Sequence, residues 1–413
     1  MQARRAAAVE RAGAAELPTT EQEEWRYSRI GELDLDAWLP AVGLDQQPAG
    51  VPDDLLPVLD AVGERAALVV VRNGHVTHVE VDDALAAKGL VVGRLIELDA
   101  DGTALGQTTG DASGMLDLLN DAFCADPVLV RVPDGMVVRA PIVIAQWLDA
   151  DGVATFPRVV VQAGADTEVS VYDHQGSTDV AALTVPVVEL DAGPAARLRY
   201  TNAQRLGPRV WQLGRQSSRA GRDATLRSTV VSLGGDYARL AIDSTMDGKG
   251  CTGELMAVYF GEGSQMHDFR TMQDHVAPAT TSNLLFKGAV QGTSRSVYTG
   301  LIHIGKQAAG VRAFQTNRNV KLSEGSWAES VPNLEIENND VQCSHASAVG
   351  PVDEEQRFYL ESRGVPPEPA ERLIVLGFFE EVLVGIPLPG AVDLLRQEIA
   401  AKLSRRELVT HGA

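Results

Sequence analysis

Residues 238–243 read Ala-Arg-Leu-Ala-Ile-Asp, and this stretch carries the pattern that decides the fold class. Leu240 and Ile242 alternate with small or charged residues, which is typical of a β-strand with one buried face. Short segments of the same kind, separated by Gly, Asp, Pro and Asn, recur from residue 128 to residue 348. The clearest of them are 128–132, 142–147, 158–162, 168–172, 197–200, 225–231, 238–243, 254–259 and 296–304.

This central region offers no convincing amphipathic helix. Many short strands without helices indicate a sandwich, a barrel or a β-helix. Residues 128–348 are a long stretch for one sandwich, whereas a β-helix grows by stacking each turn on the one before it. The pattern therefore favours a β-helix, although the sequence has no strict repeat that would exclude the other two folds.

The two flanking regions have a different character. Residues 67–72 and 75–81 are expected to pair as a hairpin around the turn Asn73-Gly74. Towards the C-terminus, apolar residues return to the three- and four-residue spacing of helices. We therefore expect three regions. Residues 1–127 form a mixed N-terminal region of helices and a few strands, residues 128–348 form a β core, and residues 349–413 form a C-terminal helical domain.

Composition excludes several classes of partner. The chain has 413 residues, with 36 Lys and Arg against 56 Asp and Glu, and a formal charge of −20. A surface this acidic repels phosphate backbones and anionic lipid headgroups. We therefore expect neither nucleic acid nor a membrane as a partner. The three cysteines, Cys124, Cys251 and Cys343, are widely spaced and odd in number, which favours a reducing cytoplasm over a disulfide framework.

One short segment carries the residues best suited to bind a metal. Cys343 and His345 are two positions apart, so their side chains share a face if the backbone is extended. Thiolate and imidazole both suit iron or zinc. Two ligands cannot close a site, so a metal bound here would need further ligands from elsewhere. The chain contains no phosphate-binding loop, no serine-nucleophile elbow and no His-Glu-x-x-His motif.

Around this segment the sequence resembles the SufB/SufD family of iron–sulfur cluster assembly proteins. The residues that carry the resemblance are Pro332-Asn333-Leu334-Glu335-Ile336, Asp340-Val341-Gln342-Cys343-Ser344-His345, Val349-Gly350, Phe358-Tyr359-Leu360, Ser362-Arg363-Gly364, His275, Ser282, Lys287-Gly288, Gly300 and Glu24-Trp25-Arg26-Tyr27. The resemblance implies a mainly β fold: a right-handed parallel β-helix core, with an N-terminal α/β region and a C-terminal helical domain.

The resemblance also implies a function. Such a chain is a non-catalytic scaffold subunit that pairs with SufB through the β-helices and docks the SufC ATPase through its C-terminal helices. A cysteine desulfurase system supplies sulfur indirectly. The nascent iron–sulfur cluster would be shared transiently with SufB, and the isolated chain would bind no cluster stably. We expect the segment from about 369 to 405 to dock the ATPase, with Phe378 and Phe379 as candidate apolar anchors, one of which is expected to pack onto the end of the β-helix instead.

Within the family, the chain is most similar to SufD. SufB-type chains carry cysteines that fall near Ser244 and at Asn317 here, and Cys343-Ser344-His345 is the SufD-like form. The resemblance makes His345 the leading cluster ligand at the SufB interface and Cys343 the weaker candidate. One departure from many relatives is Ala346 in place of glycine.

Two other functions remain open. A SufB-like subunit would accept sulfur directly, with Cys251 as the acceptor. A β-helix enzyme acting on polysaccharide would need clustered carboxylates on one face of the β-helix, and the sequence has no repeated Asp/Glu ladder of that kind.

Overall fold

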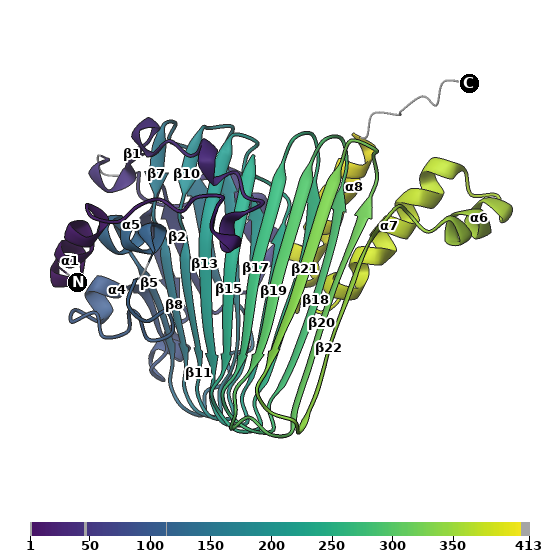
Figure 1. Cartoon of the computed structure of the whole chain (residues 1–413). Coiled ribbons are helices and arrows are strands. Elements are labelled where there is room, and N and C mark those ends of the chain that lie inside the picture. The colour runs from purple at the N-terminus through teal and green to yellow at the C-terminus, as the bar shows by residue number, and fades with distance from the viewer. Residues whose placement is uncertain (1, 45–47, 113, 406–413) are drawn as a thin grey trace.

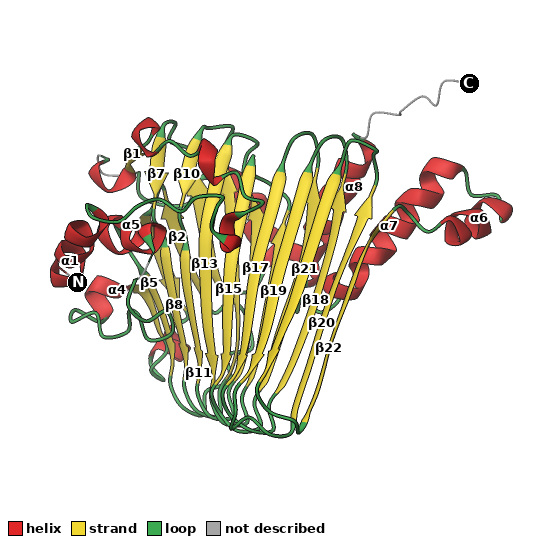
Figure 2. Cartoon of the chain, in the orientation of Figure 1, coloured by secondary structure: helices red, strands yellow, loops and turns green. Residues whose placement is uncertain are grey.

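A computed structural model describes residues 2–44, 48–112 and 114–405 (Figures 1 and 2). Its core is a parallel β-helix, and from β11 onward successive strands alternate between two facing sheets. This confirms the β-helix that the alternating segments favoured over a sandwich or a barrel. None of the helices in the part of the chain described here is long and apolar enough to cross a membrane.

The first sheet, sheet A, ends at its C-terminal edge with β21. In spatial order it consists of β21 (Trp327–Ile336), β19 (Arg295–Ile304), β17 (Met266–His275), β15 (Tyr237–Met246), β13 (Val210–Ala220), β11 (Val187–Ala192), β8 (Arg158–Ala163), β5 (Val128–Val132) and β4 (Val91–Arg94), with β10 (Ala182–Thr184), β7 (Val153–Thr155) and β1 (Leu39–Pro40) joined to it through β13. The β4–β5 pair is antiparallel, and the other neighbours are parallel.

The second sheet, sheet B, ends at the same edge with β22. Its order is β22 (Val341–Gly350), β20 (Val311–Lys321), β18 (Thr281–Val290), β16 (Thr252–Gly261), β14 (Thr225–Ser232), β12 (Arg197–Arg205), β9 (Glu168–Ser177), β6 (Ile142–Leu148), β2 (Ala67–Arg72) and β3 (His75–Val81). The predicted hairpin is confirmed as β2–β3, and Asn73 and Gly74 both have positive φ, as a tight hairpin turn requires. The N-terminal region thus contributes strands to both sheets.

Strand periodicity explains why both faces of the sheets are buried. In β6, Ile142 and Ile144 point between the sheets, while Val143 and Ala145 point outward against helices. The stretch that opened the sequence analysis behaves as predicted, because Ile242 packs in the interior. Period-two alternation sends neighbouring residues to opposite faces, so a strand covered on both sides is apolar throughout.

Helices and short helical turns cover the outer faces. The α-helices are α1 (Gln2–Ala12), α2 (Leu56–Val62), α3 (Asp83–Ala86), α4 (Leu95–Leu98), α5 (Met115–Phe123), α6 (Glu354–Ser362), α7 (Pro367–Leu383) and α8 (Pro389–Ser404), and the 3-10 turns are Glu23–Trp25, Ile30–Glu32, Leu35–Ala37, Ala41–Gly43 and Asp53–Leu55. The outer face of sheet B packs against α2, α7 and α8 in one apolar cluster. In Figure 1, α6 stands apart from the β-helix at the far end of α7.

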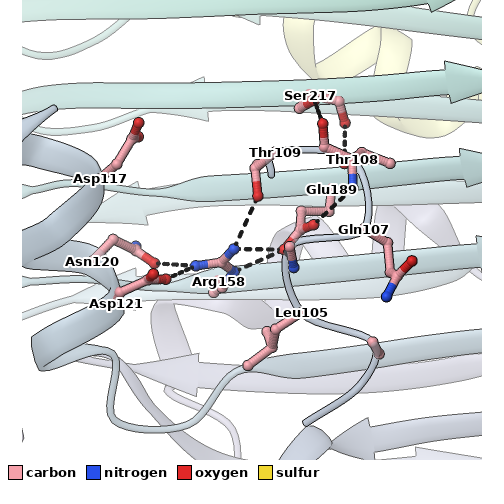
Figure 3. A network of polar contacts seen from close by, with 12 residues as sticks. Leu105, Gln107, Thr108, Thr109, Asp117, Asn120, Asp121, Arg158, Glu189 and Ser217 are labelled. Carbon is pink, nitrogen blue, oxygen red and sulfur yellow. Dashed lines mark hydrogen bonds and ion pairs between the residues drawn. The ribbon is translucent and has the colours of Figure 1, made fainter. Parts of the chain in front are cut away.

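A buried ion network fixes the N-terminal region to the outer face of sheet A (Figure 3). Arg158 on β8 is bonded to Glu189 on β11, with 2.6 Å between Nη2 and Oε1, and to Asp121 on α5. Arg4 on α1 also contacts Asp121, at 2.9 Å. The backbone amides of Gly106 and Thr108 donate to the Glu189 carboxylate. Burial alone would raise the pKa of Glu189, but Arg158 and these amides lower it below its usual value, so the carboxylate is charged at neutral pH.

Candidate functional site

The C-terminal end of the β-helix contains both predicted ligands. Strands β21 and β22 are the last in their sheets, and no strand pairs beyond them in the described part of the chain. Ala313 and Gln315 on β20 are buried, whereas Phe314 between them is exposed. Cys343 pairs with Ala313 and His345 pairs with Gln315. Both ligand candidates therefore share the interior-facing side of β22, at an end where no further turn covers them.

Cys343 is the more enclosed of the two. Its side chain is half-buried and packs against the interior cluster that contains Ile302, Ile304 and Val311. Burial raises the pKa of the Cys343 thiol, so the thiol is protonated at neutral pH. Metals bind the thiolate form of cysteine, so a protonated Cys343 is a weak ligand. In this environment it behaves mainly as a small apolar side chain.

His345 is exposed and open to the space beyond the last turn. No group of three or more His, Cys, Asp and Glu side chains across residues 2–44, 48–112 and 114–405 is arranged to hold a metal ion. His345 and Cys343 can thus offer two donors at most, both facing the open end. Further ligands for a metal there would have to come from another chain.

Apolar side chains surround the two candidates. Leu334 and Ile336 on β21 and Val349 on β22 are exposed at the same end of the β-helix. The register of β19 with β21 aligns Leu334 with buried Ile302 and Ile336 with buried Ile304, so these side chains continue the interior cluster into the open. A β-helix end with an uncovered interior and unpaired strand edges is a surface that another sheet can cover.

The two residues that we compared with cysteines of SufB-type chains lie inside the β-helix. Ser244 and Asn317 are both buried, and the Asn317 side-chain amide donates to the Tyr259 hydroxyl at 2.9 Å. Cys251, the acceptor in the alternative reading, is fully buried, and its burial raises the pKa to about 11. A sulfur acceptor needs an accessible thiolate, and Cys251 provides neither access nor charge.

The predicted anchors on the C-terminal helices are only partly available. Phe379 is fully buried, with its ring 6.2 Å from that of Phe260, so it is the one of the two that packs onto the β-helix and it cannot anchor a partner. Phe378 is half-buried, and the Lys287 ammonium lies 4.7 Å from its ring. The apolar repeat identified the helix but could not identify which of its sides packs against sheet B.

The exposed aromatic residues lie instead on α6, which sequence reasoning did not select. The side chains of Phe358 and Tyr359 are 72% and 56% exposed, and α6 buries none of its residues. A signal was present in the sequence, because α6 places Phe358, Tyr359 and Leu360 in succession in an otherwise polar helix without an apolar stripe. Aromatic residues that stay this exposed in their own chain are typical of partner-binding surfaces.

A large cleft lies on the outer face of sheet A beneath residues 15–25 and extends to Asn333 on β21. Its volume is about 980 Å³, and neither Cys343 nor His345 lines it. Three of its five carboxylates are held by arginines: Asp117 and Asp243 both contact Arg215, and Glu24 lies 3.5 Å from Arg270. Carboxylates held by arginines do not provide the free acid and base of a glycan-cleaving site.

Comparison with known proteins points to one family. Residues 146–378 match the family profile described as SUF system FeS cluster assembly, SufBD core domain. An iron–sulfur cluster assembly SufBD family protein of Mycobacterium tuberculosis is 36% identical over 288 residues, which cover 68% of this chain and 72% of that protein. A SufBD family protein of Mycobacterium leprae is 35% identical over 288 residues, which again cover 68% of this chain and 72% of that protein. One from Staphylococcus saprophyticus is 26% identical over 69% of this chain and 62% of that protein.

Proposed function

The chain belongs to the SufBD family of iron–sulfur cluster assembly proteins, and from this we propose that it is a SufD-like scaffold subunit of a cytoplasmic assembly complex. It pairs with SufB through the end of its β-helix and docks the SufC ATPase through its C-terminal helical domain. It catalyses no reaction by itself. The nascent iron–sulfur cluster is cargo that the complex builds and releases.

The open end of the β-helix is the observation that carries this proposal. Two ten-residue strands, β21 and β22, lie there beside exposed Leu334 and Ile336, and their outer edges pair with no strand among the described residues. Pairing with a similar end of another β-helix would bury this apolar surface and satisfy the free backbone groups. SufB, a paralogue expected to share the fold, is a partner of the right shape.

At such an interface His345 would be the principal ligand of this chain. It faces the open end and is exposed, so it can reach a metal held between the two subunits. Neutral imidazole is a competent iron ligand, and a SufB cysteine would supply thiolate. Cys343 would contribute less because its half-buried thiol is protonated.

The assignment to SufD rather than SufB is supported by the thiols. Cys124 and Cys251 are buried, and burial raises their pKa values to about 12 and about 11. Cys343 is half-buried. None of the three combines exposure with a low thiol pKa, which a sulfur acceptor requires. The three thiols are also unpaired, as is usual in a reducing cytoplasm.

The experiment is His345→Ala in the full SufB–SufC–SufD complex, with Ser347→Ala as control because Ser347 lies on the same side of β22. We expect the His345 variant to assemble the complex but to build clusters poorly, while the control matches wild type. A wild-type cluster yield from His345→Ala would remove this residue from the site. If the complex failed to assemble, His345 would be structural rather than a ligand.

A further inference from the structure

Gln315 is a buried amide that lacks partners in the interior of the β-helix. Its side chain is on β20 and the residue is 1% exposed. Both its oxygen and its nitrogen are buried with no hydrogen-bond partner among the described residues. Leaving both groups of a buried amide unpaired costs stability, and an apolar side chain of similar size would avoid this cost.

The surroundings of Gln315 are shaped to hold this side chain. Across the interior, Gly300 on β19 leaves space: a Cβ atom there would lie 2.3 Å from Gln315 Nε2 and 2.2 Å from the Tyr298 hydroxyl. Any larger residue at position 300 would therefore displace the amide. The chain combines a costly polar group with a glycine that makes room for it, which indicates a use for the amide.

The strand register identifies what that use is. Gln315 is the direct partner of His345 in the β20–β22 pair, and neighbouring strands lie about 4.8 Å apart. The two side chains leave their strands in the same direction, so the Gln315 amide and the His345 imidazole are neighbours on one face. His345 is the one residue of the last turn that stacks directly on Gln315.

We propose that Gln315 is a positioning residue for His345: its carbonyl oxygen accepts the hydrogen bond of one imidazole N–H, so that the other ring nitrogen presents its lone pair to the open end. Metal-ligating histidines usually donate their second N–H to a carbonyl or carboxylate in this way, which fixes the tautomer and the ring orientation. The inference rests on the proposed role of His345 and adds the residue that prepares it.

The first test is made on the isolated chain, labelled with ¹⁵N-histidine. The chain has 8 histidines, and the His345 ring signals are those lost in His345→Ala. We expect one dominant His345 tautomer in wild type at pH 8, a mixture of tautomers in Gln315→Met, and recovery of the single tautomer in Gln315→Glu, which keeps an acceptor oxygen. An unchanged tautomer in Gln315→Met would overturn the proposal.

The second test measures cluster assembly in the full complex, with Gln273→Met as matched control. Gln273 is also buried with an unpaired side-chain oxygen, but it lies on β17 in sheet A and does not pair with β22. We expect cluster assembly to fall about tenfold in Gln315→Met, which is the effect typical of losing such a support, and to match wild type in the control.

The outcomes separate the inference from the proposed function. Wild-type assembly in Gln315→Met, together with impaired assembly in His345→Ala, would overturn only the role of Gln315. Wild-type assembly in His345→Ala would remove His345 from the site and would overturn the role of Gln315 with it. A lower denaturation midpoint for Gln315→Met than for Gln273→Met would make the amide structural and would also overturn the inference.

Discussion

The buried pair Arg158–Glu189 provides a direct test of how the N-terminal region is held to the β-helix. The two side chains are only 4% and 1% exposed, so solvent does not screen their interaction. We consider three variants: Arg158→Met, Glu189→Leu and the double variant. The quantity of interest is the opening free energy of α5, which Asn120 also attaches to the β-helix by donating to the carbonyls of Pro157 and Val185.

The remaining contacts set the magnitude for each variant. Arg158→Met leaves Glu189 with two backbone donors and Asp121 with Arg4, so we expect a cost of about 3 kcal/mol, the lower end for a broken buried pair. Glu189→Leu leaves those two donors without an acceptor as well, so we expect about 4 kcal/mol. The double variant leaves neither partner of the pair behind as an unpaired charge, so it should cost no more than about 4 kcal/mol. This is at least about 3 kcal/mol less than the sum of the two single-variant costs.

Hydrogen exchange followed by mass spectrometry measures the opening free energy of α5 segment by segment. Arg199→Met is the control, because the Arg199–Glu168 pair is about 37% exposed on each side and should contribute less than about 1 kcal/mol. Single-variant costs near those of the control would contradict the argument. So would a double-variant cost equal to the sum, because it would mean that the two residues act independently.

Three further predictions follow from the structure. Phe358→Ser with Tyr359→Ser should leave the unfolding of the isolated chain unchanged within about 0.5 kcal/mol and abolish co-purification with SufC, since both rings are exposed; retained co-purification would exclude α6 as the docking surface. Burial lowers the pKa of His275 to about 4 from 6.5, so the unfolded chain binds the extra proton and stability falls as the pH drops from 6.5 towards 4. Between pH 7.5 and 5.5, wild type should therefore lose about 1 kcal/mol more in urea unfolding than His275→Gln, and equal losses would contradict this. Anaerobic reconstitution of the isolated chain with iron and sulfide should give no stable cluster, because His345 and half-buried Cys343 are at most two ligands; a stoichiometric, lasting visible chromophore would refute this.

The elements of the fold could be predicted because their signals are local. Leu240 and Ile242 alternate with their neighbours, and two positive φ angles suit Asn73-Gly74 in a hairpin turn. These patterns depend on the geometry of a few consecutive residues, so they can be read without knowing the rest of the molecule. The three cysteines and the acidic composition were likewise available from the sequence alone.

Only part of the candidate site could be predicted from local sequence patterns. An extended backbone puts Cys343 and His345 on one face, and β22 confirms that geometry. That this face points to the interior follows from the pairing of β22 with β20, and its exposure follows from β22 being the last strand of sheet B. Neither the direction of this face nor its exposure can be deduced from the spacing of the two residues.

The roles of the other residues were decided entirely by tertiary structure. Phe379 and Phe358 are both aromatic residues on helices, yet one is fully buried and the other 72% exposed, because α7 packs on sheet B and α6 does not. Arg158 pairs with Glu189 and Asp121, which are 31 and 37 positions away in the sequence. These pairs depend on how the strands and helices pack against one another. A sequence period determines which residues share a face, whereas strand order and register determine which faces meet. Burial, pairing and ligand access therefore depend on contacts that no local pattern contains.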